Sequence, residues 1–435
     1  MRVRHDVNRK VKKGRTQVET LIIEGGKRLK GTVSISGAKN AALPLMCASL
    51  LTAETLTLEN IPALTDMQTL CEVLSSLGAK AHLSESTLTL DAGQVNQFRA
   101  SYGLVSKIRA SVLVLGPLLA RFGQAEVSLP GGCAIGARPI NVLLDGLAAM
   151  GAQIELENGY VHAKVNGKLQ GCDIYLPKPA VTGTENLMMA ATLANGRTTL
   201  SNAAREPEVV DLANCLNKMG AHITGAGTST ITIDGVDALK GCTHQVMNDR
   251  IEAGTYLLMA AMAGDGVMVD GARAADNQAL ISLMKQSGVR MDQTEAGIYV
   301  HGGNGYTAVD VTTNPYPGFP TDLQAQMMAF LSLADGASIV KETVYENRFM
   351  HVPELNRMGA RLKEEGTCVH VKGNAQLIGA DVMATDLRAS ASLVLAGLCA
   401  KGVTTVHRVY HLHRGYEHLT QKLTHLGAHI RAGKE

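Results

Sequence analysis

The stretch SLPGGCAIGARPI, residues 128–140, contains side chains suited to acid–base or nucleophilic chemistry. Cys133 lies among glycines and is followed five positions later by Arg138. A thiol has a pKa near 8.5, and nearby cations or helix N-termini lower it, so Cys133 could act as an acid or a nucleophile near neutral pH. Glycines on both sides allow such a loop to close over a substrate. The alternative, a buried core cysteine, fits these polar, glycine-rich surroundings poorly.

Further charged residues stand beside apolar segments that the sequence predicts to be helices. They are Lys39 and Asn40 in SGAKN, Arg109 in KIRASV, Asp322 in FPTDLQAQ, Arg348 in ENRFMHVP, Asp386 and Arg388 in ATDLRAS, and Arg414 in HRGYE. One such arginine is more often a solvated or salt-bridged residue than a ligand. Their recurrence in equivalent loops favours a substrate with several anionic groups, because guanidinium groups bind carboxylate and phosphate bidentately.

Asp322 has two possible roles at this stage. A carboxylate can serve in acid–base chemistry. PTDLQAQ also offers Thr, Asp and a following Gln at helix-capping positions. The sequence leaves both roles open.

The sequence lacks the residue patterns of several other kinds of site. The glycine-rich loops match neither the phosphate-binding loop nor the dinucleotide fingerprint, so no nucleotide cofactor is expected. No Cys/His cluster has zinc spacing, so no metal is expected either. His411 and His413 alternate as in a strand, which predicts surface or edge-strand histidines.

Composition limits the class of protein. A chain of 435 residues predicts two to three domains, and no apolar run approaches the ~18 residues of a membrane span. Residues 1–15 hold seven Lys or Arg and one Asp, followed by no apolar signal sequence, which predicts a disordered extension over residues 1–17. The remaining chain is slightly acidic, so nucleic-acid binding is not expected. Eight scattered cysteines fit a reducing cytoplasm.

A repeated unit organises most of the chain. An apolar helical pattern ends in a glycine and is followed by a short alternating strand six times, at Gly78, Gly151, Gly220, Gly288, Gly359 and Gly427. These glycines are 68 to 73 residues apart. Helices commonly end in a left-handed residue that glycine adopts at low cost. Six units of strand, loop, helix, glycine and strand are therefore expected.

A second helix precedes these elements once per unit and is apolar nearly all round, as in ENLMMAATLANG, so it should be buried. Two domains of three units each would enclose these helices. The polar loops would then meet at helix N-termini, which favour anions.

With these motifs in place, the chain resembles the UDP-N-acetylglucosamine enolpyruvyltransferases. ISGAKNAALP, SLPGGCAIGARP, AAREPE, FPTDLQAQ, ENRFMHVPEL and ATDLRASASLVLAG together carry the resemblance over nearly the full length. It implies an α/β fold, a two-domain inside-out α/β barrel of six β-α-β-α-β-β units. The first domain would comprise residues 39–247, and the second residues 18–38 and 248–435.

The resemblance also implies roles for individual residues. Enolpyruvyl transfer from phosphoenolpyruvate to the sugar 3′-hydroxyl would begin peptidoglycan precursor synthesis. Cys133 would protonate phosphoenolpyruvate and form a covalent adduct, and a fosfomycin-type epoxide would alkylate it. Asp322 would take the hydroxyl proton, and Asn40 would steady the intermediate. The remaining residues implied in substrate binding or catalysis are Lys39, Arg109, Arg138, Lys178, Val181, Thr182, Val344, Arg348, Asp386, Arg388 and Arg414.

Two other functions remain open. One is transfer to shikimate 3-phosphate, although the NAGTAxR loop of those enzymes is absent. The other is a non-catalytic regulatory relative that binds the sugar nucleotide. Ala134 stands where the family often has Ser or Thr, and Ala180 and Thr182 replace residues that contact the nucleotide in some members. The oligomeric state stays open.

Overall fold

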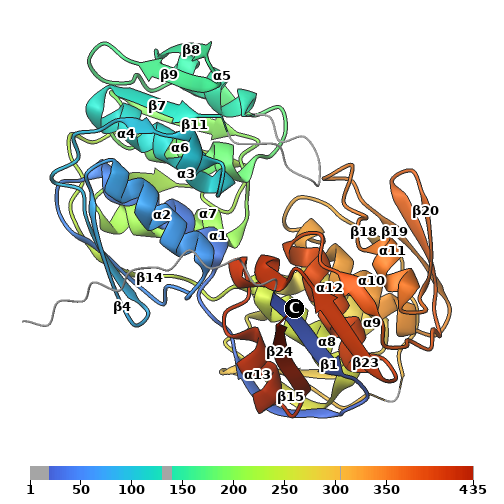
Figure 1. Ribbon diagram of the computed structural model, residues 1–435. Helices are drawn as coiled ribbons and strands as arrows, with labels where there is room; N and C mark the ends of the chain where they lie inside the picture. Colours follow the sequence, from blue (N-terminus) through green and yellow to red (C-terminus); the bar gives the residue numbers. More distant parts are fainter. Residues whose placement is uncertain (1–18, 130–139, 304, 435) are drawn as a thin grey trace, which may run out of the picture.

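The chain folds as two α/β lobes, each built round its own apolar core (Figure 1). The computed structural model describes residues 19–129, 140–303 and 305–434. One core contains buried residues between Ala38 and Val246. The other combines residues of the first strands, Leu21 to Ile35, with residues from Ile251 to Ile430. We call the lobes the first and second domain.

Each domain contains three four-stranded sheets. In each sheet one strand pairs in parallel with a neighbour, and the other pairings are antiparallel. The sheets of the first domain, in spatial order, are β14 (Thr243–Gln245), β3 (Leu56–Glu59), β5 (Thr87–Asp91) and β4 (Lys80–Ser84); β6 (Arg99–Ala100), β7 (Gln124–Ser128), β9 (Tyr160–Lys164) and β8 (Gln153–Glu157); and β10 (Asp173–Tyr175), β11 (Arg197–Ser201), β13 (Thr230–Asp234) and β12 (His222–Thr224).

The second domain repeats this arrangement. Its sheets are β16 (Met291–Gln293), β17 (Gly297–Val300), β15 (Gly264–Asp270) and β2 (Leu29–Ser34); β18 (Val311–Thr312), β19 (Ala337–Lys341), β21 (Cys368–Lys372) and β20 (Arg361–Glu365); and β22 (Asp381–Met383), β23 (Val403–His407), β1 (Glu19–Glu24) and β24 (His429–Lys434). The predicted α/β class with six repeated units is confirmed. Among the described residues the sheets stay separate, and none closes into a barrel.

Two helices per unit connect these strands. The first helix of each unit is almost wholly buried, as its apolar sequence predicts; these helices are α1 (Lys39–Ala48), α4 (Leu115–Phe122), α6 (Val181–Ala191), α8 (Arg250–Ala263), α10 (Gln324–Leu333) and α12 (Leu387–Cys399). The second helices are amphipathic: α2 (Thr65–Ser76), α5 (Asn141–Ala149), α7 (Pro207–Lys218), α9 (Gln278–Gln286), α11 (Val352–Arg357) and α13 (Leu419–His425). The structure also has α3 (Tyr102–Val105) and the 3-10 helices η1 (Ser49–Leu51), η2 (Arg109–Val114), η3 (Ala274–Asn277), η4 (Thr321–Leu323) and η5 (Val409–Arg414). No helix in the described part of the chain is long and apolar enough to cross a membrane.

The six repeated glycines close the second helices as predicted. Each has a positive φ, between 92° and 104°, and the next strand begins two or three residues later. Other residues adopt this left-handed conformation only at a cost in free energy.

The chain crosses between the domains twice, at residues 35–38 and 246–249. The two crossing segments run antiparallel, with Ala38 N–H donating to Met247 O at 2.7 Å and Asp249 N–H donating to Ser36 O at 2.8 Å. Gly37 has no room for a side chain, because a Cβ there would lie 1.7 Å from Asn60 O. The first crossing therefore leads directly into Lys39, the first residue of α1.

Of the two alternatives for His411 and His413, the edge strand is wrong, and the surface position is confirmed for His413. Both lie in η5, where Leu412 between them is buried and His413 is exposed. An alternation of only three residues also fits one turn of a 3-10 helix, so it does not identify a strand.

Candidate active site

One group of charged residues joins the two domains. Asp66, in the first turn of α2, accepts Lys39 Nζ at 3.4 Å through Oδ2. Its Oδ1 accepts Arg414 Nε from the second domain at 2.8 Å. Asp66 is buried, whereas the Arg414 side chain is 39% exposed. The polar loop before α2 thus meets η5 across the domain boundary.

A second group lies within the second domain, around Asp322. Arg348 Nη2 contacts Asp322 Oδ1 at 2.7 Å, and Arg388 contacts Oδ2 through Nη2 at 2.9 Å and Nε at 3.2 Å. Burial alone would raise the pKa of Asp322, but the two guanidinium groups outweigh it and hold this pKa well below its usual range. The Asp322 side chain is still 27% exposed, so a ligand can reach it.

A network of buried hydrogen bonds holds the Arg388 side chain of the Asp322–Arg388 pair. Arg388 Nη1 lies 3.4 Å from the Tyr416 hydroxyl, which is 2.9 Å from Thr255 Oγ1. Gln326 Nε2 lies 3.1 Å from both hydroxyls and from Asp322 O. Since all of these groups are buried, their mutual hydrogen bonds restrict the orientation of Arg388.

A separate chain of contacts orients Arg348. Its Nη1 donates to Thr321 Oγ1 at 2.9 Å, and Thr321 Oγ1 donates to Glu342 Oε2 at 2.8 Å. Glu342 Oε1 accepts the Val344 N–H at 2.7 Å. The turn that contains Val344 is therefore connected to the guanidinium group beside Asp322.

The two groups of charges act on each other electrostatically. Burial lowers the pKa of Lys39; Asp66 and Asp322 raise it, while Arg388 and Arg414 lower it further. Lys39 Nζ thus belongs to one electrostatic unit with residues of the second domain. With Lys39, Arg348, Arg388 and Arg414 against Asp66 and Asp322, this unit carries an excess of positive charge and suits an anion.

Asp322 does not cap a helix, so the capping role that the sequence left open is wrong. It lies inside η4, and no side chain caps either η4 or α10. Its carboxylate binds two arginines instead. Asp386 is the residue that caps: it accepts the backbone N–H groups of Arg388 at 2.8 Å and Ala389 at 3.1 Å at the start of α12. This cap fixes the backbone that carries Arg388.

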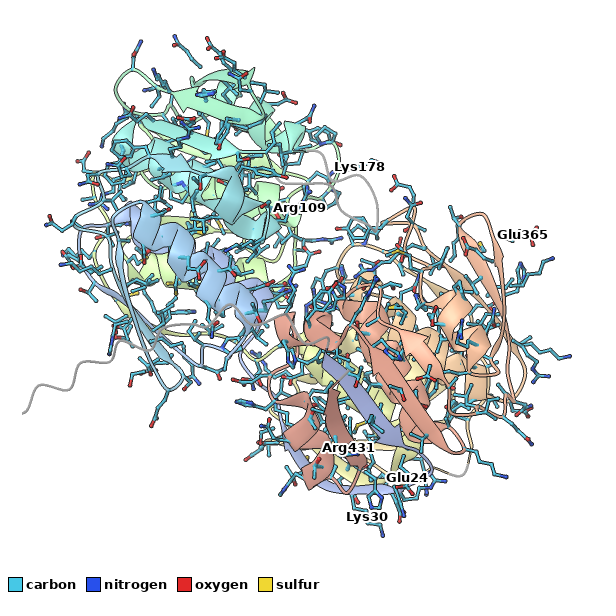
Figure 2. All side chains as sticks on the ribbon, in the orientation of Figure 1. Glu24, Lys30, Arg109, Lys178, Glu365 and Arg431 are labelled. Atoms are coloured by element: carbon cyan, nitrogen blue, oxygen red, sulfur yellow. The ribbon has the colours of Figure 1, made fainter. Side chains whose placement is uncertain are left out.

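The remaining described residues of the predicted site lie at or near the starts of three helices. Asn40 is half-buried in the first turn of α1, and Arg109 begins η2. Lys178 and Thr182 are exposed and Val181 is half-buried at the start of α6. Figure 2 shows Arg109 and Lys178 on the side of the first domain that faces the second.

A buried ion pair provides a further contact between the domains. Arg250 of α8 donates through Nε to Glu208 of α7, at 2.9 Å to Oε1 and 3.1 Å to Oε2, and both side chains are under 10% exposed. Glu185 of α6 is buried nearby; burial and the charges of Glu208 and Glu206 raise its pKa well above the usual range. Its surroundings therefore favour the protonated form of Glu185.

The glycine-rich loop cannot be placed. Cys133, Ala134 and Arg138 lie outside the described residues, as does the predicted extension over residues 1–17.

Sequence reasoning missed Asp66 as the carboxylate shared by Lys39 and Arg414. The only signal was its position in the polar loop ALTDMQ before a predicted helix. It also missed Glu208 and Arg250 as partners, and the capping role of Asp386, for which ATDLRAS offers a capping residue before an apolar run.

Comparisons with known proteins agree with this arrangement. The family model of EPSP synthase (3-phosphoshikimate 1-carboxyvinyltransferase) matches residues 23–423. The chain is 55% identical to the UDP-N-acetylglucosamine 1-carboxyvinyltransferase of Beijerinckia indica, with 95% of this chain and 98% of that protein covered. It is 53% identical to the protein of the same name from Coxiella burnetii, with 95% of this chain and 96% of that protein covered.

Solved structures show the same fold. The enolpyruvyl transferase NikO from Streptomyces tendae has a TM-score of 0.88 at 27% identity, covering 96% of this chain and 100% of that one. EPSP synthase from Acinetobacter baumannii has a TM-score of 0.76 at 18% identity, with the same coverage, and indicates the fold alone. The chain belongs to the EPSP synthase family of enolpyruvyl transferases and, within it, to the UDP-N-acetylglucosamine 1-carboxyvinyltransferases.

Proposed function

We propose that this protein transfers the enolpyruvyl group of phosphoenolpyruvate to the 3′-hydroxyl of UDP-N-acetylglucosamine and releases phosphate, the first committed step of peptidoglycan precursor synthesis. The observation that carries the proposal is the cationic unit at the domain boundary, where Lys39, Arg348, Arg388 and Arg414 surround the carboxylates of Asp66 and Asp322. The names of relatives more than 50% identical over nearly the whole chain support the same reaction.

The reaction needs an acid and a base on the two reactants. In the addition step, the sugar oxygen bonds to C2 of phosphoenolpyruvate, its hydroxyl proton leaves, and C3 gains a proton. In the elimination step, C3 loses a proton, the C2–O bond to phosphate breaks, and phosphate departs. We assign the proton donor to Cys133 and the acceptor of the hydroxyl proton to Asp322.

The ion pairs of Asp322 impose a condition on this assignment. A carboxylate held by two guanidinium groups is a weak base. An anionic substrate group that binds Arg348 or Arg388 would weaken their hold on Asp322 and raise its pKa. Substrate binding would therefore make Asp322 more basic at the moment the base is needed.

The cations would hold the two anionic groups of phosphoenolpyruvate. We assign the phosphate and carboxylate to Lys39, Arg109, Arg138 and Arg414, with Arg388 and Arg348 completing the site from the second domain. Developing negative charge in the addition step would be stabilised by these fixed charges. Asn40 would hydrogen-bond the tetrahedral intermediate, and Asp386 would act by fixing the start of α12.

The sugar nucleotide would lie against the start of α6. Lys178, Val181, Thr182 and Val344 are assigned to it because Lys178 and Thr182 are exposed where α6 begins and α6 is a buried helix whose N-terminus favours an anion. Ala180 and Thr182 differ from residues that contact the nucleotide in some members, so these contacts are the least transferable ones.

We also propose the domain limits and location that accompany this function. The first domain would span residues 39–247 and the second residues 18–38 and 248–435, matching the two cores and the two crossings. The enzyme would act in the cytoplasm, where phosphoenolpyruvate and nucleotide sugars are found and scattered cysteines stay reduced.

Phosphate release tests the reaction and its acceptor together. The protein is mixed with phosphoenolpyruvate and either UDP-N-acetylglucosamine or shikimate 3-phosphate. Release with the sugar nucleotide alone is expected. Release with shikimate 3-phosphate alone would overturn the acceptor, and no release from a folded protein that binds the sugar nucleotide would indicate the regulatory relative instead.

Alkylation tests the assigned thiol. A fosfomycin-type epoxide should inactivate the protein and add its mass to the peptide containing Cys133. The variant Cys133→Asp keeps an acidic group but no thiol, and it should resist. Inactivation of that variant at the wild-type rate would remove Cys133 from the mechanism.

A further inference from the structure

Two cysteines of the first domain, Cys215 and Cys242, lie between α7 and the segment that leads into β14. Cys215 lies on α7 and is buried; Cys242 precedes β14 and is half-buried. Each thiol is close enough to the other to change its pKa. Neither residue belongs to the charged site, and the proposed reaction uses neither.

The contact is part of a fixed register between α7 and the segment 240–247, which runs antiparallel to the helix. At one end, Lys240 N–H donates to Met219 O at 2.8 Å. At the other end, Asp211 accepts His244 Nε2 at 3.0 Å through Oδ1 and the Met247 N–H at 3.2 Å through Oδ2. The two thiols lie between these two sets of hydrogen bonds, which hold α7 and the segment 240–247 in a fixed position relative to each other.

The backbone at Cys242 is held as well. Its carbonyl accepts the Thr57 N–H of β3 at 2.9 Å, and β14 pairs in parallel with β3 immediately after it. Asp211, Cys215 and Lys218 recur every three or four residues, so they share one face of α7. The segment 240–247 is therefore held by β3 as well as by this face of α7.

The surroundings also activate one of the two thiols. The contact with Cys215 lowers the pKa of Cys242 and outweighs the effect of partial burial; with His244 and Lys218 adding to it, this pKa is about 7. The same contact and burial raise the pKa of Cys215. Cys242 is also the more exposed of the two, so it is the nucleophile and Cys215 the resolving thiol, an arrangement typical of redox-sensitive pairs.

We propose that Cys215 and Cys242 form a reversible disulfide when the protein meets a peroxide. The Cys242 thiolate attacks one peroxide oxygen, the O–O bond breaks, and a sulfenic acid and hydroxide form. The sulfur of Cys215 then attacks the Cys242 sulfur, the S–O bond breaks, and water leaves with the Cys215 proton. Overall, two thiols lose two electrons and two protons, and hydrogen peroxide becomes two water molecules.

The disulfide would fasten α7 to the segment that leads into the second crossing. Cys242 is separated from residues 246–249 only by β14, and α7 carries Glu208, which binds Arg250 just beyond that crossing. In the oxidised protein, α7 would therefore be linked to the chain on both sides of residues 246–249, by the disulfide at Cys242 and by the ion pair at Arg250. A dithiol reductant would restore the free thiols.

Peptide mapping of the full-length protein tests the proposal. After treatment with hydrogen peroxide, trypsin without reductant should yield residues 206–218 and 241–250 as one cross-linked pair, about half of the total or more, and dithiothreitol should separate them. Scoring this peptide pair makes the result independent of oxidation at Cys133. Cys172, a half-buried cysteine beside Asp173, is the internal control and should stay largely free.

Thermal unfolding gives a second measurement. The oxidised wild type should have a higher midpoint than the reduced protein, because the disulfide restricts the unfolded chain between residues 215 and 242. Cys242→Ser, at the half-buried position, should fold normally and show no such rise, and Cys172→Ser should behave as wild type. Sulfinic acid at Cys242 with Cys215 still free, or cross-linking no faster than modification of Cys172, would overturn the proposal.

Discussion

Lys39 in the first domain and Asp322 in the second carry opposite charges, and their surroundings affect those charges in opposite ways. Burial lowers the pKa of Lys39, so its positive charge is disfavoured, and its ion pair with Asp66 is 3.4 Å long. Two close guanidinium groups lower the pKa of Asp322, so its negative charge is strongly favoured.

This difference shows how an anionic substrate would change each half of the site. An anion beside Lys39 supplies charge that its buried environment lacks, so binding raises the pKa of Lys39. An anion beside Arg348 or Arg388 competes with Asp322 and raises its pKa also. Binding would thus stabilise the positive charge of Lys39 and make Asp322, the proposed base, more basic.

The largest effect is expected from Asp322→Asn, which keeps the shape but removes the base. Turnover should fall about 1,000-fold, within the range for general base catalysis. The Kd for phosphoenolpyruvate should stay the same or decrease, because two arginines lose their competing carboxylate. Steady-state kinetics and calorimetry measure the two quantities. Asp381→Asn, at a side chain 75% exposed, is the control. Turnover within about threefold of wild type would exclude Asp322 as the base.

Lys39→Met should lower kcat/KM for phosphoenolpyruvate about 100-fold, because a buried charge is lost from the anion site. In the wild type, affinity should fall as the pH rises through the lowered pKa of Lys39, thus at a lower pH than for an ordinary lysine. Lys39→Arg should remove this alkaline loss, since arginine stays charged. Lys363→Met on the exposed edge of β20 should change neither quantity. An unaltered pH profile in Lys39→Arg would contradict the assignment.

His351 offers a smaller effect, on stability. Burial lowers its pKa to about 4, and Asp386 only partly offsets this. Between pH 6.5 and 4 the unfolded chain binds a proton that the folded protein does not, so stability falls as the pH falls through this window. The slope is about 1.4 kcal/mol per pH unit for one proton.

Denaturant titrations across that range check this slope. His351→Gln should reduce it by one proton equivalent, whereas His370→Gln, at a side chain 48% exposed, should preserve it. Equal slopes in wild type and His351→Gln would show that His351 does not stay neutral.

The smallest effect is expected from Asp66→Asn, which tests the contact between the two halves of the site. Asp66 raises the pKa of Lys39, so neutralising it should move the alkaline loss of phosphoenolpyruvate affinity to lower pH. The pH profile of kcat/KM measures the shift, and Asp91→Asn on β5 is the control. A shift to higher pH would mean that another group controls the profile.

Local features of the sequence predicted the fold well. The six glycines repeat at a nearly constant spacing and each has the backbone conformation for which glycine is suited. Apolar residues on nearly every face predicted which helices are buried. In α8, for example, all 14 residues are buried. The strand predicted at the histidines of η5 was wrong, because an alternation over three residues is too short to distinguish a strand from a 3-10 turn.

The partners within the site could not be predicted in the same way. Asp66 and Arg414 are 348 residues apart, and Asp322 and Arg388 are 66 apart. No periodicity connects such residues, because their contact depends on how elements far apart in the chain pack together. Sequence motifs therefore identified Lys39, Asp322 and Arg388 as candidates but left open which carboxylate binds which cation.

The double crossing also determines when each domain can fold during synthesis on the ribosome. The first domain has all its strands once β14 is made, and β14 ends at Gln245. The second domain begins with β1 and β2, which have no partner strands until β15 and β23 appear. Its last sheet is complete only with β24, the last strand of the described chain. The first domain can therefore fold while the ribosome is still translating, whereas the second, and with it the pairing of Asp322 and Arg388, must wait for nearly the whole chain.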